Sequence, residues 1–473
     1  MKRILSKLRG CLRLDRRSTP RRARSPTTID AGVSKPTAIQ GSLVSAMKGS
    51  QAESICQSFQ TTSPLENLPP ELRRLLLSFL DLEALSTLVH ASPIFYHQYL
   101  ADRRYLRRKC LEMTLSSVAF DSCAAYWLDS TDFMSTRSTE TVTQFLESYR
   151  DRRASTDFWT FIEKPTDDDV SGMITFYSSI IKPLARSYTA WALGNLATET
   201  KNSLSREPFS KTEQTRLRRA LYRFQICCKL FGQNRHRWIN SPRLKPVDIL
   251  KMFFCVFEPW EVEEIACIYT FAQEKYDQIF HDICWDVHQE NPKFANETRP
   301  PTPVGAFHLN DSYDRKQLLI GTLSHGLELL HAVHIIRDHE HLVSMMQKHI
   351  SWPCGYFLED EALGDGAQTD RRREQPSSRD QKQLQRDPMP FEGDGDLGAN
   401  EPRPPLAWTL MWGGTYSNLY GYCVPDAIRR WGYVMWDAPR LDRTGAKEVL
   451  ARQWEDEWGD DEWGEDPRDT LLY

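Results

Sequence analysis

Apolar residues are most concentrated between residues 63 and 110, where they recur at the spacing of an amphipathic helix. The first group repeats every three or four positions and consists of Leu72, Leu75, Leu76, Phe79 and Leu80. After the acidic break at Asp81, a second group continues the pattern with Leu82, Leu85, Leu88 and Val89. This periodicity predicts two short helices.

Two proline-containing sequences predict where helices begin. Leu68-Pro69-Pro70 precedes the first group, and proline is tolerated in the first turn of a helix, where its missing N–H needs no partner. Ser92-Pro93 repeats this arrangement, with Ser92 as a candidate N-cap. A third helix is therefore expected after Ser92, with an apolar face formed by Ile94, Phe95, Tyr99 and Leu106.

This three-helix module is small for an independent domain. A unit of roughly forty residues buries only about 60% of the surface that its unfolded chain exposes. Two interpretations of the leucines follow. They form the core of an ordinary helical bundle, or some of them face another chain.

The chain after the module is predicted to form a helical body over residues 111–358. Helical periodicity covers residues 141–164, 170–197, 210–231, 246–257, 260–289 and 315–350. The range 210–231 has the clearest end signals, because Ser210 and Glu213 form a capping box and Gly232 follows the last apolar position. No period of about 20–50 residues is present, which argues against a repeat array.

The ends of the chain and one internal segment differ in composition from the body. Residues 1–62 are basic and rich in Ser and Thr, residues 359–405 are charged and rich in Gly and Pro, and both are expected to be disordered. Residues 406–446 are dense in aromatic side chains, which predicts that they dock back on the body and complete one discontinuous domain. Residues 447–473 form an acidic tail with three tryptophans.

Each tail has three interpretations. The acidic tail is a solvated segment, a partner-binding segment, or a strap over a basic patch of the same chain that high salt would release. The basic N-terminus is a solvated tail, a nuclear-import patch or a mitochondrial transit peptide. Its arginines include Arg16, Arg17, Arg21, Arg22 and Arg24.

Composition excludes several classes of protein. A net charge of -4 gives no global reason to expect nucleic acid, and no apolar run approaches the roughly 18 residues of a membrane span. The 11 cysteines include no C-x-x-C pair, so neither a disulfide framework nor a zinc site is indicated, and a reducing compartment is expected.

Candidate chemistry is sparse. Half of the 12 histidines fall in the predicted helix 315–350, namely His325, His331, His334, His339, His341 and His349. His331 and His334 lie one turn apart but lack the glutamate of H-E-x-x-H, so we expect no metal. Phosphate loops, dinucleotide fingerprints and nucleophile elbows are absent, and carboxylate pairs such as Glu263-Glu264 are expected on solvated faces. No cofactor and no catalytic residue is predicted.

The leucine-dense module resembles the F-box. The opening Leu-Pro-x-Glu-Leu of that family is matched by Leu68, Pro69, Glu71 and Leu72, and its later positions are matched by Leu76, Leu77, Phe79, Leu80, Leu85, Leu88 and Phe95. Many F-boxes carry Val-Cys-Arg where this chain has Ala91-Ser92-Pro93, a departure that resembles the F-box-like proteins of filamentous fungi. The helical body and its WGYVMWDAPRL ending bear a weaker likeness to the same proteins.

The resemblance implies a partner for part of the leucine stretch. In the family, the matching positions face a Skp-type adaptor, which here would involve Leu68, Pro69, Leu72, Leu76, Leu80 and Leu85. The adaptor would tether the protein to a cullin and so to an SCF-type ubiquitin ligase, and the helical body would hold a protein target. In such a complex the helix would lie in a groove of the adaptor, and a few buried aliphatic side chains would supply most of the binding energy.

The sequence therefore predicts a mainly α-helical, non-catalytic substrate receptor that acts in the cytoplasm, the nucleus or both. One alternative is a protein that binds the adaptor outside a ligase, or a scaffold whose leucines pack only on its own body. Another is an enzyme whose site is not recognisable from motifs.

Overall fold

The computed structural model describes residues 63–130, 133, 137–153, 166–201, 208–232, 244–295, 303–353, 358, 362–395, 403–459 and 466–470. The predicted disordered tail, residues 1–62, lies outside this part. The mainly α fold is confirmed, because the described residues contain helices and no strand, with one isolated antiparallel bridge between Pro388 and Thr415. Among the described helices, none alone has the length and apolar character of a membrane span. One pair, Ser312–Leu323 and Leu327–Ile335, has this length and character when the two helices are taken together, but they are separated by a 105° bend.

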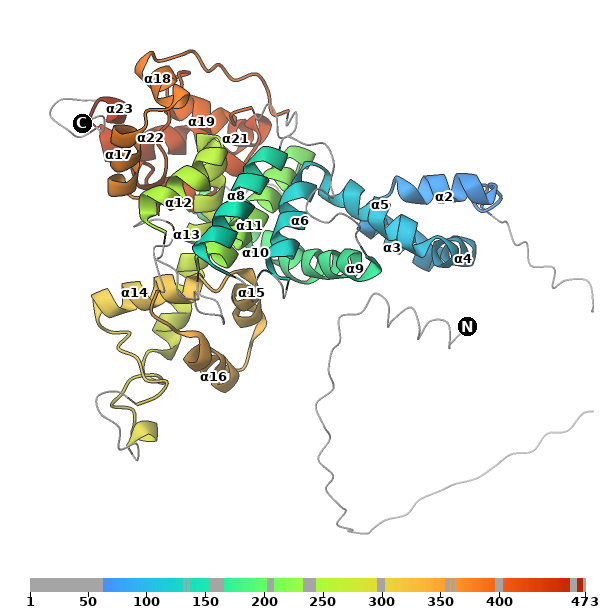
Figure 1. The fold of residues 1–473 in the computed structure, drawn as a ribbon, viewed down its shortest axis with the longest axis horizontal. Helices are drawn as coiled ribbons and strands as arrows, with labels where there is room; N and C mark the ends of the chain where they lie inside the picture. Colours follow the sequence, from blue (N-terminus) through green and yellow to red (C-terminus); the bar gives the residue numbers. More distant parts are fainter. Residues whose placement is uncertain are drawn as a thin grey trace, which may run out of the picture. The chain divides into compact units, whose positions relative to one another are not determined.

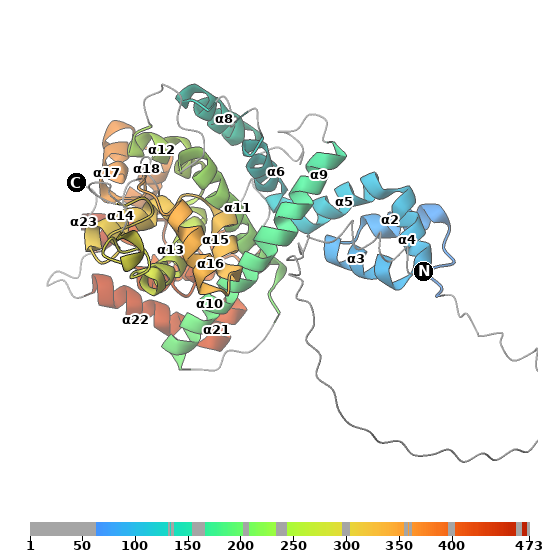
Figure 2. The ribbon, with the colours of Figure 1, turned by 90° about the horizontal axis from the view of Figure 1, so that it is seen from below.

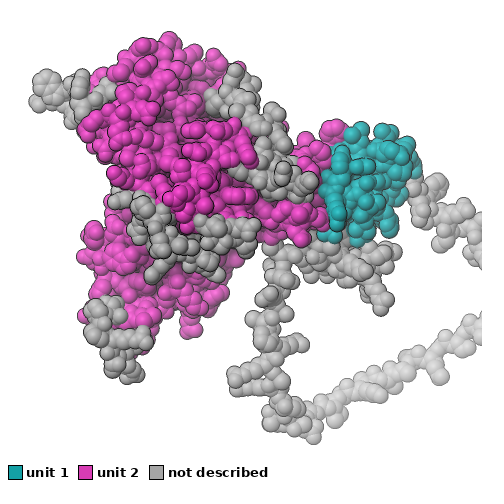
Figure 3. Space-filling view, in the orientation of Figure 1, with its two compact units in different colours: residues 1–78, 83–106 teal, residues 79–82, 107–473 magenta. Residues whose placement is uncertain are grey.

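The described chain divides into two compact units (Figure 3). Unit 1 contains the described residues up to Ser78 together with Glu83–Leu106, and unit 2 contains Phe79–Leu82 and the chain from Arg107 onward. Unit 1 thus covers most of the predicted 63–110 module.

Unit 1 contains the three predicted helices and the start of a fourth. These are α2 (Pro70–Ser78), α3 (Leu82–Ala91), α4 (Pro93–Ala101) and α5 (Arg103–Leu115). Pro70 opens α2, and Ser92 caps α4 by accepting a hydrogen bond from the Phe95 amide at 3.4 Å, as the proline signals predicted. The apolar side chains buried in this unit are Leu77, Leu85, Val89, Phe95, Tyr99 and Leu106.

The first part of unit 2 is built around two long helices. Those two are α11 (Lys211–Phe231) and α13 (Pro259–Ile283), and they lie in contact within the unit (Figures 1 and 2). Around them lie α6 (Ala119–Leu128), which contacts α11, and α10 (Lys182–Thr200), which contacts both long helices. Further out, α9 (Asp167–Phe176) packs against α6, and α8 (Thr139–Arg152) packs against α12 (Pro246–Met252). The predicted capping box of α11 is present, and α11 ends where Gly232 follows it. A π-helical segment, Tyr177–Ile181, links α9 to α10 without a break.

The single helix predicted over 315–350 is wrong. Three helices replace it, namely α14 (Ser312–Leu323), α15 (Leu327–Ile335) and α16 (His339–His349). The first break lies at Gly326, whose φ of +91° lies outside the helical region and favours glycine. The second lies before Asp338, which caps α16 by accepting from the His341 amide at 2.8 Å.

The disordered insertion predicted over 359–405 is also wrong for its described residues. This segment contains α17 (Asp365–Glu374) and α18 (Ser378–Leu384). Arg371 of α17 pairs with Asp380 of α18 through two hydrogen bonds of 2.7 Å. Arg379 then donates to the backbone carbonyl of Phe257 at 2.6 Å, which ties α18 to the chain just before α13. The Arg371–Asp380 ion pair and the Arg379 hydrogen bond thus hold in place a segment that is poor in apolar residues.

The aromatic segment packs into the core of unit 2. Its helices are α19 (Leu406–Met411), α20 (Asp426–Arg429) and α21 (Ala438–Thr444), and Trp408, Trp431 and Trp436 are buried in the same cluster as α11 and α13. The acidic tail is not a free segment where it is described. It continues as α22 (Ala446–Trp458), which buries Val449 and Leu450, and a short α23 (Pro467–Thr470) follows.

Candidate functional site

The most unusual surface of unit 1 is the exposed leucine face of α2. Leu72 and Leu75 are 48% and 49% exposed although they lie one turn apart in a helix. Leu65, before the helix, and Phe79, just after it, are exposed as well. Scattered exposed apolar residues are normal, but apolar residues grouped on one helix face indicate a binding surface.

The opposite side of α2 supplies the packing that holds the helix in place. Leu77 is fully buried, and α2 packs against α4. Arg74 adds an ion pair to Asp102 at 3.7 Å, with its guanidinium 4.2 Å from the centre of the Tyr105 ring. Other residues therefore hold α2 in unit 1, and the side chains of Leu72 and Leu75 do not supply this packing.

A polar bridge fixes the segment that leads into α2. The Ser92 hydroxyl donates to the Glu66 carboxylate at 2.5 Å, and the other oxygen of Glu66 accepts from the Ser63 amide at 3.2 Å. Arg73 donates to the Glu66 carbonyl at 3.4 Å. Ser92 thus caps α4 and also holds a residue that lies before α2.

The structure distributes the six predicted adaptor-binding residues over different environments. Pro69 and Leu72 are exposed, and Leu68, Leu76 and Leu80 are half-buried. Leu80 belongs to the short segment 79–82 that groups with unit 2.

Leu85 is only 5% exposed, so the structure assigns it to the core of its unit and corrects its placement on a partner surface. Sequence reasoning did not single out Leu75, which is as exposed as Leu72. The spacing of the two leucines was visible, but it does not say which face of the helix is buried.

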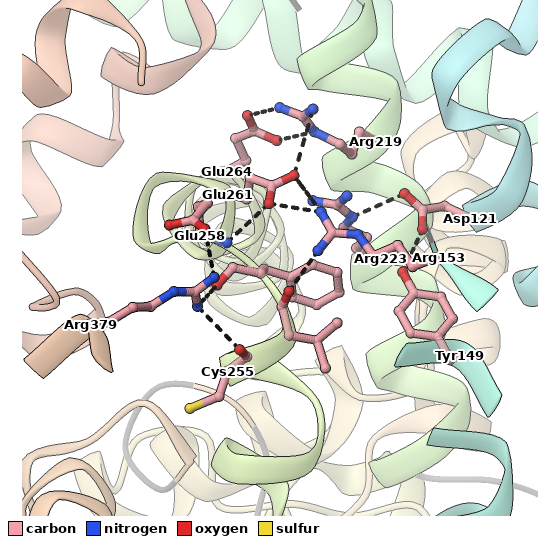
Figure 4. Close-up of polar contacts among 12 residues, drawn as sticks. Asp121, Tyr149, Arg153, Arg219, Arg223, Cys255, Glu258, Glu261, Glu264 and Arg379 are labelled. Carbon is pink, nitrogen blue, oxygen red and sulfur yellow. Dashed lines mark hydrogen bonds and ion pairs between the residues drawn. The ribbon is translucent and has the colours of Figure 1, made fainter. Parts of the chain in front are cut away.

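The second candidate is a buried charge network between α6, α11 and α13 (Figure 4). Arg223 of α11 donates to Asp121 of α6 at 3.0 Å and to Glu261 of α13 at 2.8 Å. Arg153, just after α8, donates to both oxygens of Glu261 at 2.8 and 2.9 Å. Asp121 also accepts from the Tyr149 hydroxyl at 2.5 Å.

The same network continues along α13. Glu264 accepts two hydrogen bonds from Arg219, at 2.5 and 2.9 Å. Glu263, on another side of the helix, pairs with Arg429 at 3.0 Å and accepts from the Gly421 amide at 2.7 Å. Both carboxylates are fully buried, so the predicted solvated face at Glu263-Glu264 is wrong. Their arginine partners lie 45 and 166 positions away, and local spacing could not reveal them.

Electrostatics indicate a structural role for this network. Burial by itself would raise the pKa of Glu261, but Arg153, Arg223 and Arg219 hold it well below the ordinary value. The pKa of Glu264 is raised by burial despite its pair with Arg219. Each of these carboxylates is engaged by an arginine, so neither has the open side that a substrate or a general base requires. The network joins α6, α11 and α13 through paired charges.

The described histidines and cysteines form no group of potential metal ligands. Burial lowers the pKa values of His331 and His334, and no group of three or more potential ligands is present there. The described cysteines are free, and burial raises the pKa of Cys110 to about 12, which disfavours the reactive thiolate.

Comparison of the chain with family models, with curated proteins and with solved structures gives no match. The exposed face of α2 is therefore the feature from which a function can be argued. The buried network of unit 2 describes how the body is held together.

Proposed function

We propose that this protein is an F-box-like substrate receptor of an SCF-type ubiquitin ligase, acting in the cytoplasm or nucleus. Unit 1 binds a Skp-type adaptor, the adaptor links it to a cullin, and unit 2 presents a protein target. The observation that supports this most is the exposure of Leu72 and Leu75 on a helix whose other side is firmly packed.

The leucine face has the energetic character of a binding anchor. Fully burying one leucine contributes about 1.5–3 kcal/mol relative to leaving it exposed. Leu72 and Leu75 are each about half exposed, so burying the rest of both in a partner groove contributes about 1.5–3 kcal/mol in total. Leu68, Pro69 and Leu76 lie beside them in the sequence.

Ser92 supports an internal role for the part of the module that departs most from the family. In its place many F-boxes have the cysteine of Val-Cys-Arg, whereas here Ser92 caps α4 and bridges to Glu66. This position is engaged inside unit 1. The departure therefore leaves the leucines of α2 free to act as the adaptor surface.

The proposed mechanism requires no chemistry from this chain. Holding a target close to a loaded conjugating enzyme raises the local concentration of the attacking lysine.

Co-purification with the adaptor tests this proposal. Wild-type chain should recover a Skp-type adaptor and a cullin, whereas Leu72→Asp and Leu75→Asp should each weaken adaptor binding at least tenfold. Leu410→Asp is a matched control, because Leu410 is 45% exposed on α19 in unit 2 and should leave binding unchanged. Circular dichroism should be the same for all chains. Adaptor binding that survives both α2 substitutions would refute the assignment of this surface.

The second candidate function is an interaction protein outside any ligase. The same exposed leucines support it, because they indicate a partner without naming the complex. Recovery of adaptor without a cullin would favour an adaptor-binding protein, and recovery of neither would favour a scaffold.

A further inference from the structure

The last described residues of the chain return to the body and dock there. Arg468 of α23 is only 6% exposed, and its guanidinium donates to the Thr415 hydroxyl at 2.8 Å and to the Tyr416 carbonyl at 3.1 Å. The guanidinium also lies 5.3 Å from the centre of the Trp412 ring. The body thus contributes an aromatic face, a hydroxyl and a backbone carbonyl to a single arginine.

Two carboxylates flank this arginine and meet one cation of the body. Asp466 and Asp469 lie 3.3 and 2.7 Å from the two terminal nitrogens of Arg386. Asp466 also accepts from Arg468 itself at 2.6 Å, which neutralises the buried charge. Although burial alone would raise the pKa of Asp466, the Arg468 hydrogen bonds lower it.

The walls of the site are joined to one another by contacts that do not involve the docked segment. The Met389 amide donates to the Gly414 carbonyl and the Tyr416 amide donates to the Asp387 carbonyl, both at 2.8 Å. These two backbone segments form one wall of the site. Trp454 of α22 packs on Trp412 with a ring separation of 5.0 Å and forms another. None of these three contacts involves residues 466–470.

The docked segment resembles a bound peptide in its chemistry. From Asp466 to Asp469 it brings one arginine, two carboxylates and a proline, and it brings no large apolar side chain. Its attachment therefore depends on specific polar contacts and on one cation–aromatic contact, which are worth about 0.5–2 kcal/mol each. A segment of the same chemistry from another protein would compete for the same contacts.

We propose that this site recognises a target segment of the form Asp-x-Arg-Asp, and that the chain's own residues 466–470 occupy it as an internal competitor. This inference deepens the proposed function, on which it rests for naming the partner as the target. A target with higher affinity, or many local copies of the motif, displaces the internal segment. A chain without target keeps its recognition site filled.

Peptide binding to full-length chains tests the inference. The probe is a fluorescent peptide with the sequence of residues 465–470, measured by anisotropy. Because the internal segment belongs to the same chain, its effective concentration at the site exceeds that of a dilute free probe, and it competes with the probe in wild type. The Arg468→Ala chain should therefore bind the probe at least tenfold more tightly than wild type.

Three controls sharpen this measurement. Arg373→Ala removes an exposed arginine of α17 that forms an ion pair with Asp370 at 3.3 Å, and it should behave as wild type. A probe carrying Arg468→Ala should not bind. Arg386→Ala combined with Arg468→Ala should lose affinity for the intact probe, because the carboxylates lose their cation.

A folded Arg468→Ala chain that does not bind the probe at millimolar concentration would overturn the inference and make the segment a structural clasp. If that variant fails to fold, a protease site in place of residues 460–465 allows the segment to be cut after folding. Probe binding after cutting supports the inference, and its absence contradicts it. These measurements use no adaptor, so they can fail while adaptor capture succeeds, and the reverse.

Discussion

Three arginines of α11 take positions that a helix of this kind usually gives to apolar residues. Arg216, Arg219 and Arg223 are buried, and each meets a carboxylate from a distant part of the chain. Arg216 pairs with Asp437 at 2.9 Å, so α11 is joined to the C-terminal segment as well as to α6 and α13. Removing one partner of a buried pair costs far more than the intact pair contributes, because the other charge is left uncompensated.

The first prediction concerns Arg223, which lies between two carboxylates. Arg223→Leu leaves Asp121 and Glu261 without one of their hydrogen-bond donors and should lower the free energy of unfolding by about 3–5 kcal/mol. Arg150→Ala is the control, because its pair with Asp151 is mostly exposed and should contribute less than about 0.5 kcal/mol. Urea unfolding followed by circular dichroism measures both. A loss below about 1 kcal/mol for Arg223→Leu would contradict a structural role for the network.

The second prediction concerns the pH dependence of Asp380. Burial would raise the pKa of this carboxyl, but its hydrogen bonds with Arg371, Ser377 and Asn418 lower it strongly. A lowered pKa stabilises the fold above the unfolded value of about 3.9, and this stability is lost as the pH falls below it. Between pH 7 and pH 3 the wild type should therefore lose about 1 kcal/mol more than Asp380→Asn.

Asp380→Asn should also be less stable than wild type at pH 7, by about 3 kcal/mol, because Arg371 is left buried without its carboxylate. Asp370→Asn, in an exposed pair with Arg373, is the matched control and should change neither value. Urea midpoints at both pH values measure the effect. If wild type and Asp380→Asn lose the same stability between pH 7 and pH 3, Asp380 is not the source of the acid sensitivity.

At the scale of the elements, helices that are specified by neighbouring residues could be predicted, and helices that depend on distant residues could not. The start of α11 could be predicted because Ser210 and Glu213 are three residues apart, and the start of α4 could be predicted from Ser92-Pro93. The helices α17 and α18 were missed, because their order depends on Arg371, Asp380 and contacts that are far from them in the sequence. Polar composition indicates disorder only when no such tertiary partners exist.

The third prediction tests the break between α14 and α15. An added Cβ at Gly326 would lie 2.8 Å from the Gln225 side-chain oxygen, and the φ of +91° disfavours any other residue. Gly326→Ala should therefore lower the free energy of unfolding by about 1–3 kcal/mol. Gly194→Ala is the matched control, because Gly194 lies within α10 with nothing near its Cβ position.

The control should move in the opposite direction. Alanine restricts the unfolded chain and favours the helix, so Gly194→Ala should raise the free energy of unfolding by about 0.4–1 kcal/mol. Thermal and urea unfolding compare the two variants. A neutral Gly326→Ala would mean that the turn between α14 and α15 can adopt another conformation.

At the scale of the whole molecule, the sequence predicted the division of the chain better than it predicted the surfaces. The module at 63–110 corresponds closely to unit 1, and the aromatic segment packs in the core of unit 2. Among the residues predicted to bind the adaptor, Leu72 is exposed whereas Leu85 is buried. Both leucines lie on regular stripes, and only the packing of three helices together decides which stripe faces inward.

The fourth prediction is that the two units lose their structure separately. Phe95 is 1% exposed in unit 1, and Phe→Ala in a core costs about 3–5 kcal/mol. A unit of roughly forty residues has little stability to spare, so Phe95→Ala should unfold unit 1 at 25 °C. Unit 2 has a continuous core cluster of its own, which begins at Leu111, so unit 2 should remain folded.

Hydrogen exchange read by mass spectrometry distinguishes the two ways in which adaptor binding can fail. Phe95→Ala should remove amide protection from α2, α3 and α4 while the amides of α11 and α13 stay protected. Leu72→Ala should leave all of these protected, because surface substitutions usually change stability by less than about 0.5 kcal/mol. Both variants should lose adaptor binding under the proposed function, the first through unfolding and the second through loss of an anchor. Protection that disappears from both units in Phe95→Ala would show instead that the chain folds as one cooperative body, and the leucine face of α2 would then have to be tested only with surface substitutions.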